Sequence, residues 1–169
     1  MTIKTRDFGV IEIENDSVIN FTQPILGFED YEFFVVLMDD EIDSGIAFLQ
    51  CITEPELCFF IISLANALDE IKSHGEEISL TPESFRQIYG DDYEVFCILN
   101  LKDDFMDSTV NLRSPVLINP ISKRGMQIVL EADYPVKQRL FGESSCEKGG
   151  DGKASDTSSE KNDFIRGGK

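Results

Sequence analysis

The chain has 169 residues, of which 41% are hydrophobic, with 13 Phe and no Trp. A chain of this length suits a single domain that buries a core of aliphatic and Phe side chains. Its formal net charge of −17 disfavours direct binding to nucleic acid or to an anionic membrane surface, because both present negative phosphates.

The negative charge is unevenly distributed along the chain. Residues 143–169 hold six acidic and five basic side chains, so a net charge of −16 belongs to residues 1–142. An acidic surface keeps a protein soluble. It also suits a cationic partner, or a partner whose RNA has to be repelled. The sequence leaves both interpretations open.

Strands dominate the apolar pattern. Alternation over residues 2–8, Gly9 and renewed alternation over 10–13 predict two short strands joined near Phe8 and Gly9. The run 33–38 is apolar throughout, and we expect it to form a strand buried on both faces. Further strands are predicted, in chain order, over 18–21, 46–52, 57–64, 93–101, 109–112, 116–118 and 126–130.

One helix has clear signals at both ends. The hydroxyl of Thr81 can cap it, Pro82 suits its first position, and Gly90 follows its end. A second segment, 65–73, has helical composition and ends at His74 and Gly75. The apolar positions of the first helix share one face: Phe85, Ile88 and Tyr89.

These elements predict a mainly β fold over residues 1–142, a small antiparallel β-barrel or sandwich with one or two short helices. Residues 143–169 consist mostly of Ser, Gly, Lys and Asp, with four apolar residues among 27. Such a segment cannot bury enough surface to offset its ordering entropy, so we expect a disordered polar tail.

The cysteines match no metal-binding or redox spacing. Three of them, Cys51, Cys58 and Cys97, lie within apolar runs, where a free thiol behaves as a small hydrophobe, and Cys146 lies in the polar tail. The sequence predicts no metal or cofactor. It contains no secretion-type leader and no apolar run long enough to span a membrane, so we expect a reduced, cytoplasmic protein.

Catalysis is not indicated. The single histidine, His74, lies among polar residues at a helix end, and no Ser or Cys lies in a nucleophile turn. No phosphate-binding glycine loop is present. Carboxylates are abundant, so a hydrolase that uses paired carboxylates stays open as an alternative, although the acidic stretches fall in predicted turns.

Six short motifs together resemble the FliW family of flagellar assembly factors, in order and spacing over residues 3 to about 140. They are Gly-Phe-Glu at 27–29, Leu-Gln at 49–50, Pro-Glu-Leu at 55–57 with Phe59, Thr-Val-Asn-Leu at 109–112, Pro-Val-Leu-Ile-Asn at 115–119 and Gly-Met-Gln at 125–127. The resemblance implies a small β-barrel-like protein that works by binding. It implies two protein partners: CsrA, an RNA-binding translational repressor of flagellin synthesis, and flagellin itself, which titrates the FliW-like protein away from CsrA.

The resemblance gives the acidic turns a candidate role. CsrA must present cationic surface to RNA, so we expect acidic side chains to contact it: Asp39, Asp40, Asp43, Asp103, Asp104 and Asp107. Phe28 forms either an apolar docking patch or a plug for the barrel. Asn111 and Asn119 either brace a neighbouring loop or contact a partner, and Gly27 and Gly125 are expected at turns that need positive φ. A flagellin export chaperone that does not bind CsrA is the alternative binding function.

Overall fold

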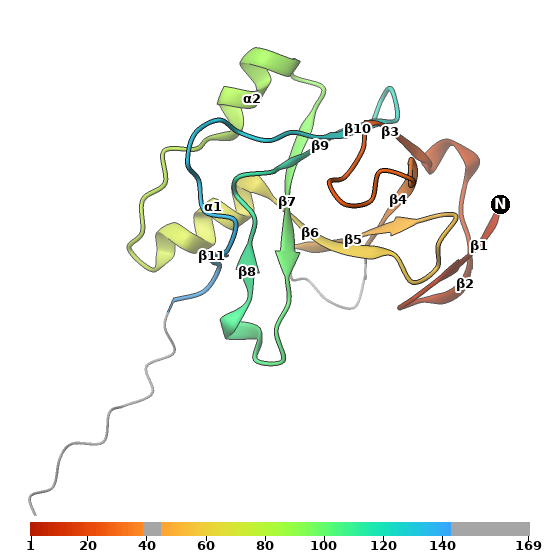
Figure 1. Cartoon of the computed structure of the whole chain (residues 1–169), viewed down its shortest axis with the longest axis horizontal. Helices are drawn as coiled ribbons and strands as arrows, with labels where there is room; N and C mark the ends of the chain where they lie inside the picture. The colour runs from red at the N-terminus through yellow and green to blue at the C-terminus, as the bar shows by residue number, and fades with distance from the viewer. Residues whose placement is uncertain (39–44, 143–169) are drawn as a thin grey trace, which may run out of the picture.

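The computed structural model describes residues 1–38 and 45–142, and it is mainly β (Figure 1). Its helices are α1 (Leu64–Ser73) and α2 (Pro82–Tyr89), with short 3-10 helices η1 (Asn15–Ser17) and η2 (Phe105–Asp107). Its strands are β1 (Thr2–Thr5), β2 (Gly9–Glu12), β3 (Ile19–Gln23), β4 (Phe33–Met38), β5 (Ile46–Cys51), β6 (Cys58–Ser63), β7 (Glu94–Asn100), β8 (Thr109–Val110), β9 (Val116–Asn119), β10 (Arg124–Gln127) and β11 (Gln138–Arg139).

Seven strands close into a barrel in the order β3, β4, β5, β6, β7, β9, β10. The closing pair, β10 with β3, is parallel, and the other pairs in the barrel are antiparallel. Strand β7 is shared, because its first half pairs with β9 and its last two residues pair with β8. The predicted fold class is therefore confirmed, with one parallel pairing that the sequence did not indicate.

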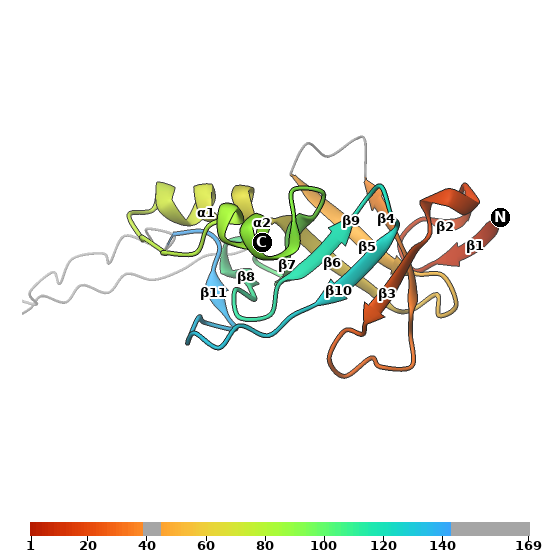
Figure 2. The ribbon, with the colours of Figure 1, turned by 90° about the horizontal axis from the view of Figure 1, so that it is seen from above.

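The helices and the N-terminal hairpin lie at opposite ends of the barrel (Figures 1 and 2). The predicted hairpin, β1 with β2, is present: its turn spans residues 6–8, and Gly9 begins β2 opposite Thr5. It is attached to the barrel by the ring of Phe8, which meets the ring of Phe48 edge-on with centroids 4.8 Å apart. Edge-on packing is a favoured geometry for aromatic pairs, so the hairpin is fixed to β5.

The core has two parts because some barrel strands are buried on both faces. On β6, Ile61 packs with Phe34 and Leu49 inside the barrel, whereas its neighbour Ile62 packs under the helices with Leu64. Alternation of side chains along a strand produces this division. Strand β4 departs from the prediction. Its Phe34 and Val35 are buried on the two faces, but Phe33 is 40% exposed and Met38 is 68% exposed, because the strand ends reach past the covering elements.

Both helices lie where the sequence predicts them, but two details of α2 differ. The hydroxyl of Thr81 makes no cap bond to the backbone and contacts the Ser84 hydroxyl at 3.0 Å instead. Of the predicted apolar face, Phe85 is buried, whereas Ile88 is 74% exposed. Tyr89, four residues after Phe85, is partly buried and packs against the same core cluster. The covered stripe therefore runs through positions 85 and 89, and Ile88 lies beside it.

Gly125 serves a different purpose from the one predicted. It lies within β10 rather than in the turn, and positive φ is found at the preceding turn residue Lys123, at 56°. A Cβ at Gly125 would lie 2.4 Å from the ring of Phe21 on the paired strand β3. The glycine therefore admits a buried aromatic ring against the backbone, a close approach that only glycine allows.

Candidate protein-binding surfaces

The loop between β3 and β4 is packed against the barrel. Ile25 is 2% exposed, and the half-buried ring of Phe28 meets Phe59 edge-on with centroids 5.0 Å apart. The backbone N–H of Leu26 donates to Oε1 of Gln127 on β10 at 2.9 Å. Of these apolar loop side chains only Leu26, at 58% exposure, projects fully from the surface. Phe28 thus acts mainly as a plug for the barrel.

A carboxylate is fixed beside Leu26. Gly27 has φ +85°, the left-handed conformation that was predicted for it, and its N–H donates to Oε1 of Glu29 at 2.8 Å. This hydrogen bond from Gly27 favours the ionised form and lowers the pKa of Glu29. The loop therefore presents the exposed Leu26 beside a carboxylate that is held in place.

The second acidic turn contains η2 and is held by its own carboxylates. Asp104 accepts a hydrogen bond from the backbone N–H of Met106 at 3.0 Å, which caps η2. Asp107 pairs with Arg139 of β11 at 2.9 Å, and Asp103 is exposed. An exposed ion pair contributes little to stability. Of these predicted contact residues, only Asp103 has no structural task in the described part of the chain. Asp39, Asp40 and Asp43 lie outside the described residues.

Asn111 and Asn119 make the same arrangement at two different turns. Oδ1 of Asn111 accepts the backbone N–H groups of residues 113 and 114, at 3.1 and 3.0 Å. Oδ1 of Asn119 accepts those of residues 121 and 122, at 3.0 and 2.8 Å. Such Asx-type bonds fix a turn. In the described structure both residues therefore brace their loops, which is one of the two roles the sequence left open.

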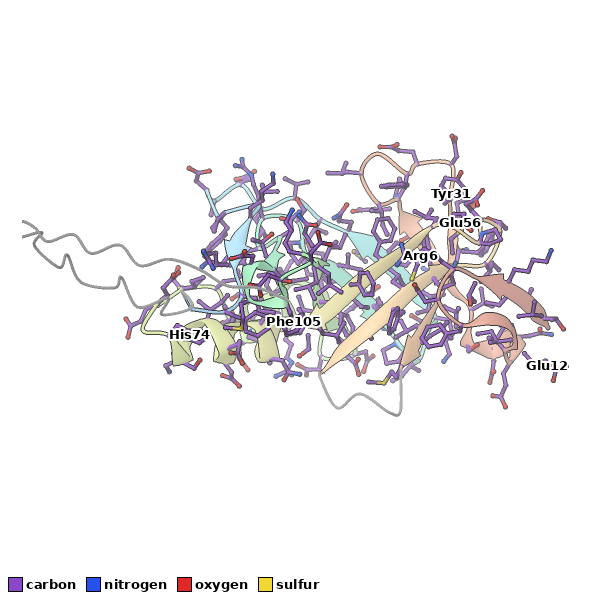
Figure 3. All side chains as sticks on the ribbon, turned by 90° about the horizontal axis from the view of Figure 1, so that it is seen from below. Arg6, Glu12, Tyr31, Glu56, His74 and Phe105 are labelled. Carbon is purple, nitrogen blue, oxygen red and sulfur yellow. The ribbon has the colours of Figure 1, made fainter. Side chains whose placement is uncertain are left out.

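The predicted contact residues do not form one site. Phe28 packs with the interior cluster of the barrel, whereas η2 packs against the other cluster through Phe105 and Phe141, whose ring centroids are 4.6 Å apart. Figure 3 shows the separation, because Tyr31, which donates its N–H to the Phe28 carbonyl, lies far from Phe105. Any partner that contacts both would have to span the molecule.

Gln50 is a buried polar residue for which the sequence predicted no role beyond its place in a motif. It is 0% exposed, and its Nε2 group lies 3.0 to 3.4 Å from the carbonyl oxygens of residues 51, 54, 55 and 57. Its Oε1 accepts the N–H of Arg6 at 3.5 Å. The amide therefore fixes the β5–β6 loop and joins it to the N-terminal hairpin. A polar side chain within the apolar run of β5 was the sequence signal for it.

Arg6 lies on the surface that Gln50 organises. Its guanidinium pairs with Asp7 at 2.9 Å and lies over the ring of Phe60 at 5.3 Å. The hydrogen bond to Asp7 raises the pKa of Arg6. The loop carries the exposed Glu56, and Figure 3 places Arg6, Glu56 and Tyr31 in the same region. This region combines both charges and an aromatic ring, as protein contact surfaces do.

A cleft of about 520 Å³ lies beside α1, and we call it the α1 cleft. Residues of β5, α1, η2 and the segment after β11 line it, among them Ile46, Asn66, Asp69, Glu70, Phe105 and Phe141. The rings and Ile46 make its apolar wall, and the carboxylates of Asp69 and Glu70 lie on its helical side. No local sequence pattern predicts this cleft, because its walls come from four separate segments of the chain.

The side chains suited to chemistry are dispersed. His74 Nε2 contacts Oε1 of Glu70 at 3.1 Å, one helical turn away on α1 and in contact with solvent. Within residues 1–38 and 45–142, no group of three or more His, Cys, Asp or Glu side chains is arranged to hold a metal ion. None of the helices described is long and apolar enough to cross a membrane.

Comparison with known proteins identifies a family whose members share this barrel fold. The model of the FliW protein family matches residues 2–140. The chain belongs to the FliW family. Several residues of the motifs that carry the resemblance have structural roles. Gln50 donates to carbonyls of the β5–β6 loop, Asn119 and Gly125 lie at the β9–β10 hairpin, and Gln127 accepts a hydrogen bond from the loop that holds Phe28.

Matches to individual relatives extend over nearly the whole length of each relative. The chain is 33% identical over 156 residues to a flagellar assembly factor FliW of Lachnoclostridium phytofermentans, covering 88% of this chain and 99% of the relative. It is 34% identical over 157 residues to that of Heliobacterium modesticaldum, covering 90% and 99%. A crystal structure of the flagellar assembly factor FliW superposes with a TM-score of 0.66 at 33% identity, over 85% of this chain and 99% of that one. The fold and the role of flagellar assembly factor follow from this membership.

Proposed function

We propose that this flagellar assembly factor acts in the cytoplasm by binding rather than catalysis, and that its partners are CsrA and flagellin. Bound to CsrA, it would relieve the repression of flagellin synthesis. Flagellin that has not been exported would occupy it and release CsrA. Such a switch needs only two coupled binding equilibria and no chemical step.

The observation that supports this proposal most strongly is the position of the charge. The family match covers residues 2–140, and residues 1–142 carry −16 of the total charge. CsrA binds RNA and so must present cationic surface, which an acidic body attracts over a distance before contact. Once bound nearby, the same charge disfavours phosphate at the RNA site.

We assign part of this effect to the acidic turn at η2 and to Asp39, Asp40 and Asp43. A variant that carries Asp103→Asn, Asp104→Asn and Asp107→Asn tests the turn without unfolding it, because Asn at position 104 still caps η2. A matched control removes three exposed carboxylates near η1 at the other end of the barrel: Glu12→Gln, Glu14→Gln and Asp16→Asn.

The experiment is a titration of each purified variant with CsrA and, separately, with flagellin, at two salt concentrations. The native chain should bind both partners, and raising the salt should weaken CsrA binding. The η2 variant should bind CsrA more weakly with a smaller salt dependence, and the control should resemble the native chain. Flagellin binding without CsrA binding would favour the export chaperone instead. Binding to neither partner would contradict both functions and reopen the question of enzymatic activity.

A further inference from the structure

The α1 cleft combines an apolar wall with an anionic rim. On the apolar side, Phe105 is 43% exposed and lies against the half-buried Phe141. On the helical side stand Asp69, which is exposed, and Glu70, whose Oε1 also contacts His74. A ligand that fits both sides carries a bulky apolar side chain next to a cation.

The described chain ends at this cleft. After β11, Leu140 is 1% exposed and donates its N–H to the carbonyl of Ser108 at 3.1 Å, which holds the segment to the start of β8. Phe141 lines the cleft, and Gly142 lies so close to His74 that a Cβ on it would approach Nδ1 to 2.6 Å. The described part of the chain therefore ends next to the cleft.

The sequence that follows contains one segment with the required chemistry. Among residues 143–169 the apolar side chains are Cys146, Ala154, Phe164 and Ile165, and only the last two are adjacent. Arg166 follows them directly. The order of two large apolar side chains and a guanidinium matches the aromatic wall and the carboxylate rim of the cleft.

We propose that Phe164, Ile165 and Arg166 bind in the α1 cleft of their own chain. The two apolar side chains lie against Phe105 and Phe141, and the guanidinium faces Asp69 and Glu70. This segment occupies a surface that a cationic, apolar segment of another protein would otherwise find open. Where the proposed function holds, a partner that uses the cleft has to displace the chain's own segment first.

The linker length favours this intramolecular contact. Phe164 is 22 residues beyond Gly142, and a Gly- and Ser-rich segment of that length has a root-mean-square span of about 26 Å. A tether of this kind gives an effective concentration on the order of 1 mM. A contact with a dissociation constant of about 1 mM, a weak one, is then formed in about half of the molecules.

The chain's lack of Trp allows a direct test. Phe164→Trp places a single Trp in the segment, and Ala154→Trp places one in the same tail outside it. We expect the emission of the first to be shifted to the blue and its quenching by acrylamide to be roughly halved relative to the second. Equal emission maxima and equal quenching for the two variants would overturn the proposal.

Two further variants locate the contact, both measured in the full chain with Phe164→Trp. Reversal of the rim charges, Asp69→Lys with Glu70→Lys, should abolish the blue shift and the protection. The control, Asp91→Lys with Asp92→Lys, changes the same charge in the exposed turn before β7 and should leave both intact. A blue shift that persists in the rim variant, or one that grows with protein concentration, would overturn binding within one chain at this cleft. The readout does not depend on CsrA or flagellin, so its failure is distinct from that of the proposed function.

Discussion

The side-chain amide of Gln50 donates to the backbone carbonyl of Leu57 at 3.1 Å across the β5–β6 loop. The same Nε2 group lies 3.1 Å from the carbonyl of Pro55, and the Gln50 side chain is completely buried. One amide thus replaces the water that these loop carbonyls would need. The loop beside Arg6 owes its shape to a residue beneath it.

Gln50→Leu should destabilise the protein by about 1–3 kcal/mol, because it keeps the side-chain volume but removes the side-chain donor to the Pro55 carbonyl. The carbonyls of Leu57 and Glu54 keep the backbone N–H groups of Cys51 and Leu57 as donors. The measurement is the free energy of unfolding from a urea titration. The exposed Gln87 of α2 offers a matched control, and Gln87→Leu should change stability by less than about 0.5 kcal/mol. Equal effects of the two substitutions would show that the buried amide is not needed.

Gly125→Ala should cost about 1–3 kcal/mol, the range for forcing extra atoms into a packed core. The new Cβ would meet Cε2 of Phe21 at 2.4 Å. Because the two residues are in contact, their effects should not add. Phe21→Leu in the Gly125→Ala background should cost less than Phe21→Leu in the native chain. Additive costs would contradict the steric relation between these residues.

The buried thiol of Cys97 should make the folded protein less stable at alkaline pH. Burial raises the pKa of the Cys97 thiol to about 12, from an ordinary value of 9.0. Between these values the unfolded chain releases the thiol proton and the folded chain retains it, so stability falls as the pH rises above about 9. For one proton the slope reaches about 1.4 kcal/mol per pH unit.

Cys97→Ala isolates this contribution, because Tyr and Lys side chains also titrate in this range in both proteins. The free energy of unfolding should be lower for the variant at pH 7, where a small cavity is its only cost. The difference between the two proteins should then shrink between pH 9 and 11. A difference that stays constant over that interval would contradict the assignment of a neutral, buried thiol.

The sequence was sufficient to predict secondary structure where interactions between neighbouring residues determine it. Pro82 and Gly90 predicted the two ends of α2, and the alternation around Gly9 predicted the β1–β2 hairpin. Strand β11 was missed because Gln138 and Arg139 carry no strand pattern, and only their pairing with β8 makes them a strand. Ile88 was predicted on the covered face of α2, but only Phe85 and Tyr89, four residues apart, pack against the core cluster, and Ile88 lies at the edge of that stripe.

The candidate site was predictable only in part, for the same reason. Gly125 and Phe21 are distant in sequence, so their close approach leaves no local pattern. The apolar residues of the β3–β4 loop are compatible with either a docking patch or a plug for the barrel. The contact of Phe28 with Phe59 shows that the ring packs on the barrel, and a contact of Phe28 with a partner stays a prediction. The α1 cleft depends on the contact between Phe105, which precedes β8, and Phe141, which follows β11. No spacing along the sequence predicts this contact.

In the proposed switch, CsrA and flagellin exclude one another from this acidic barrel. The most direct measurement starts from the full chain bound to labelled CsrA and follows the fluorescence anisotropy of CsrA while flagellin is added. We predict that flagellin releases CsrA in a saturable manner and that added CsrA raises the apparent dissociation constant for flagellin, because coupling between two ligands is reciprocal. An anisotropy that stays at its bound value while flagellin saturates the protein would contradict the account.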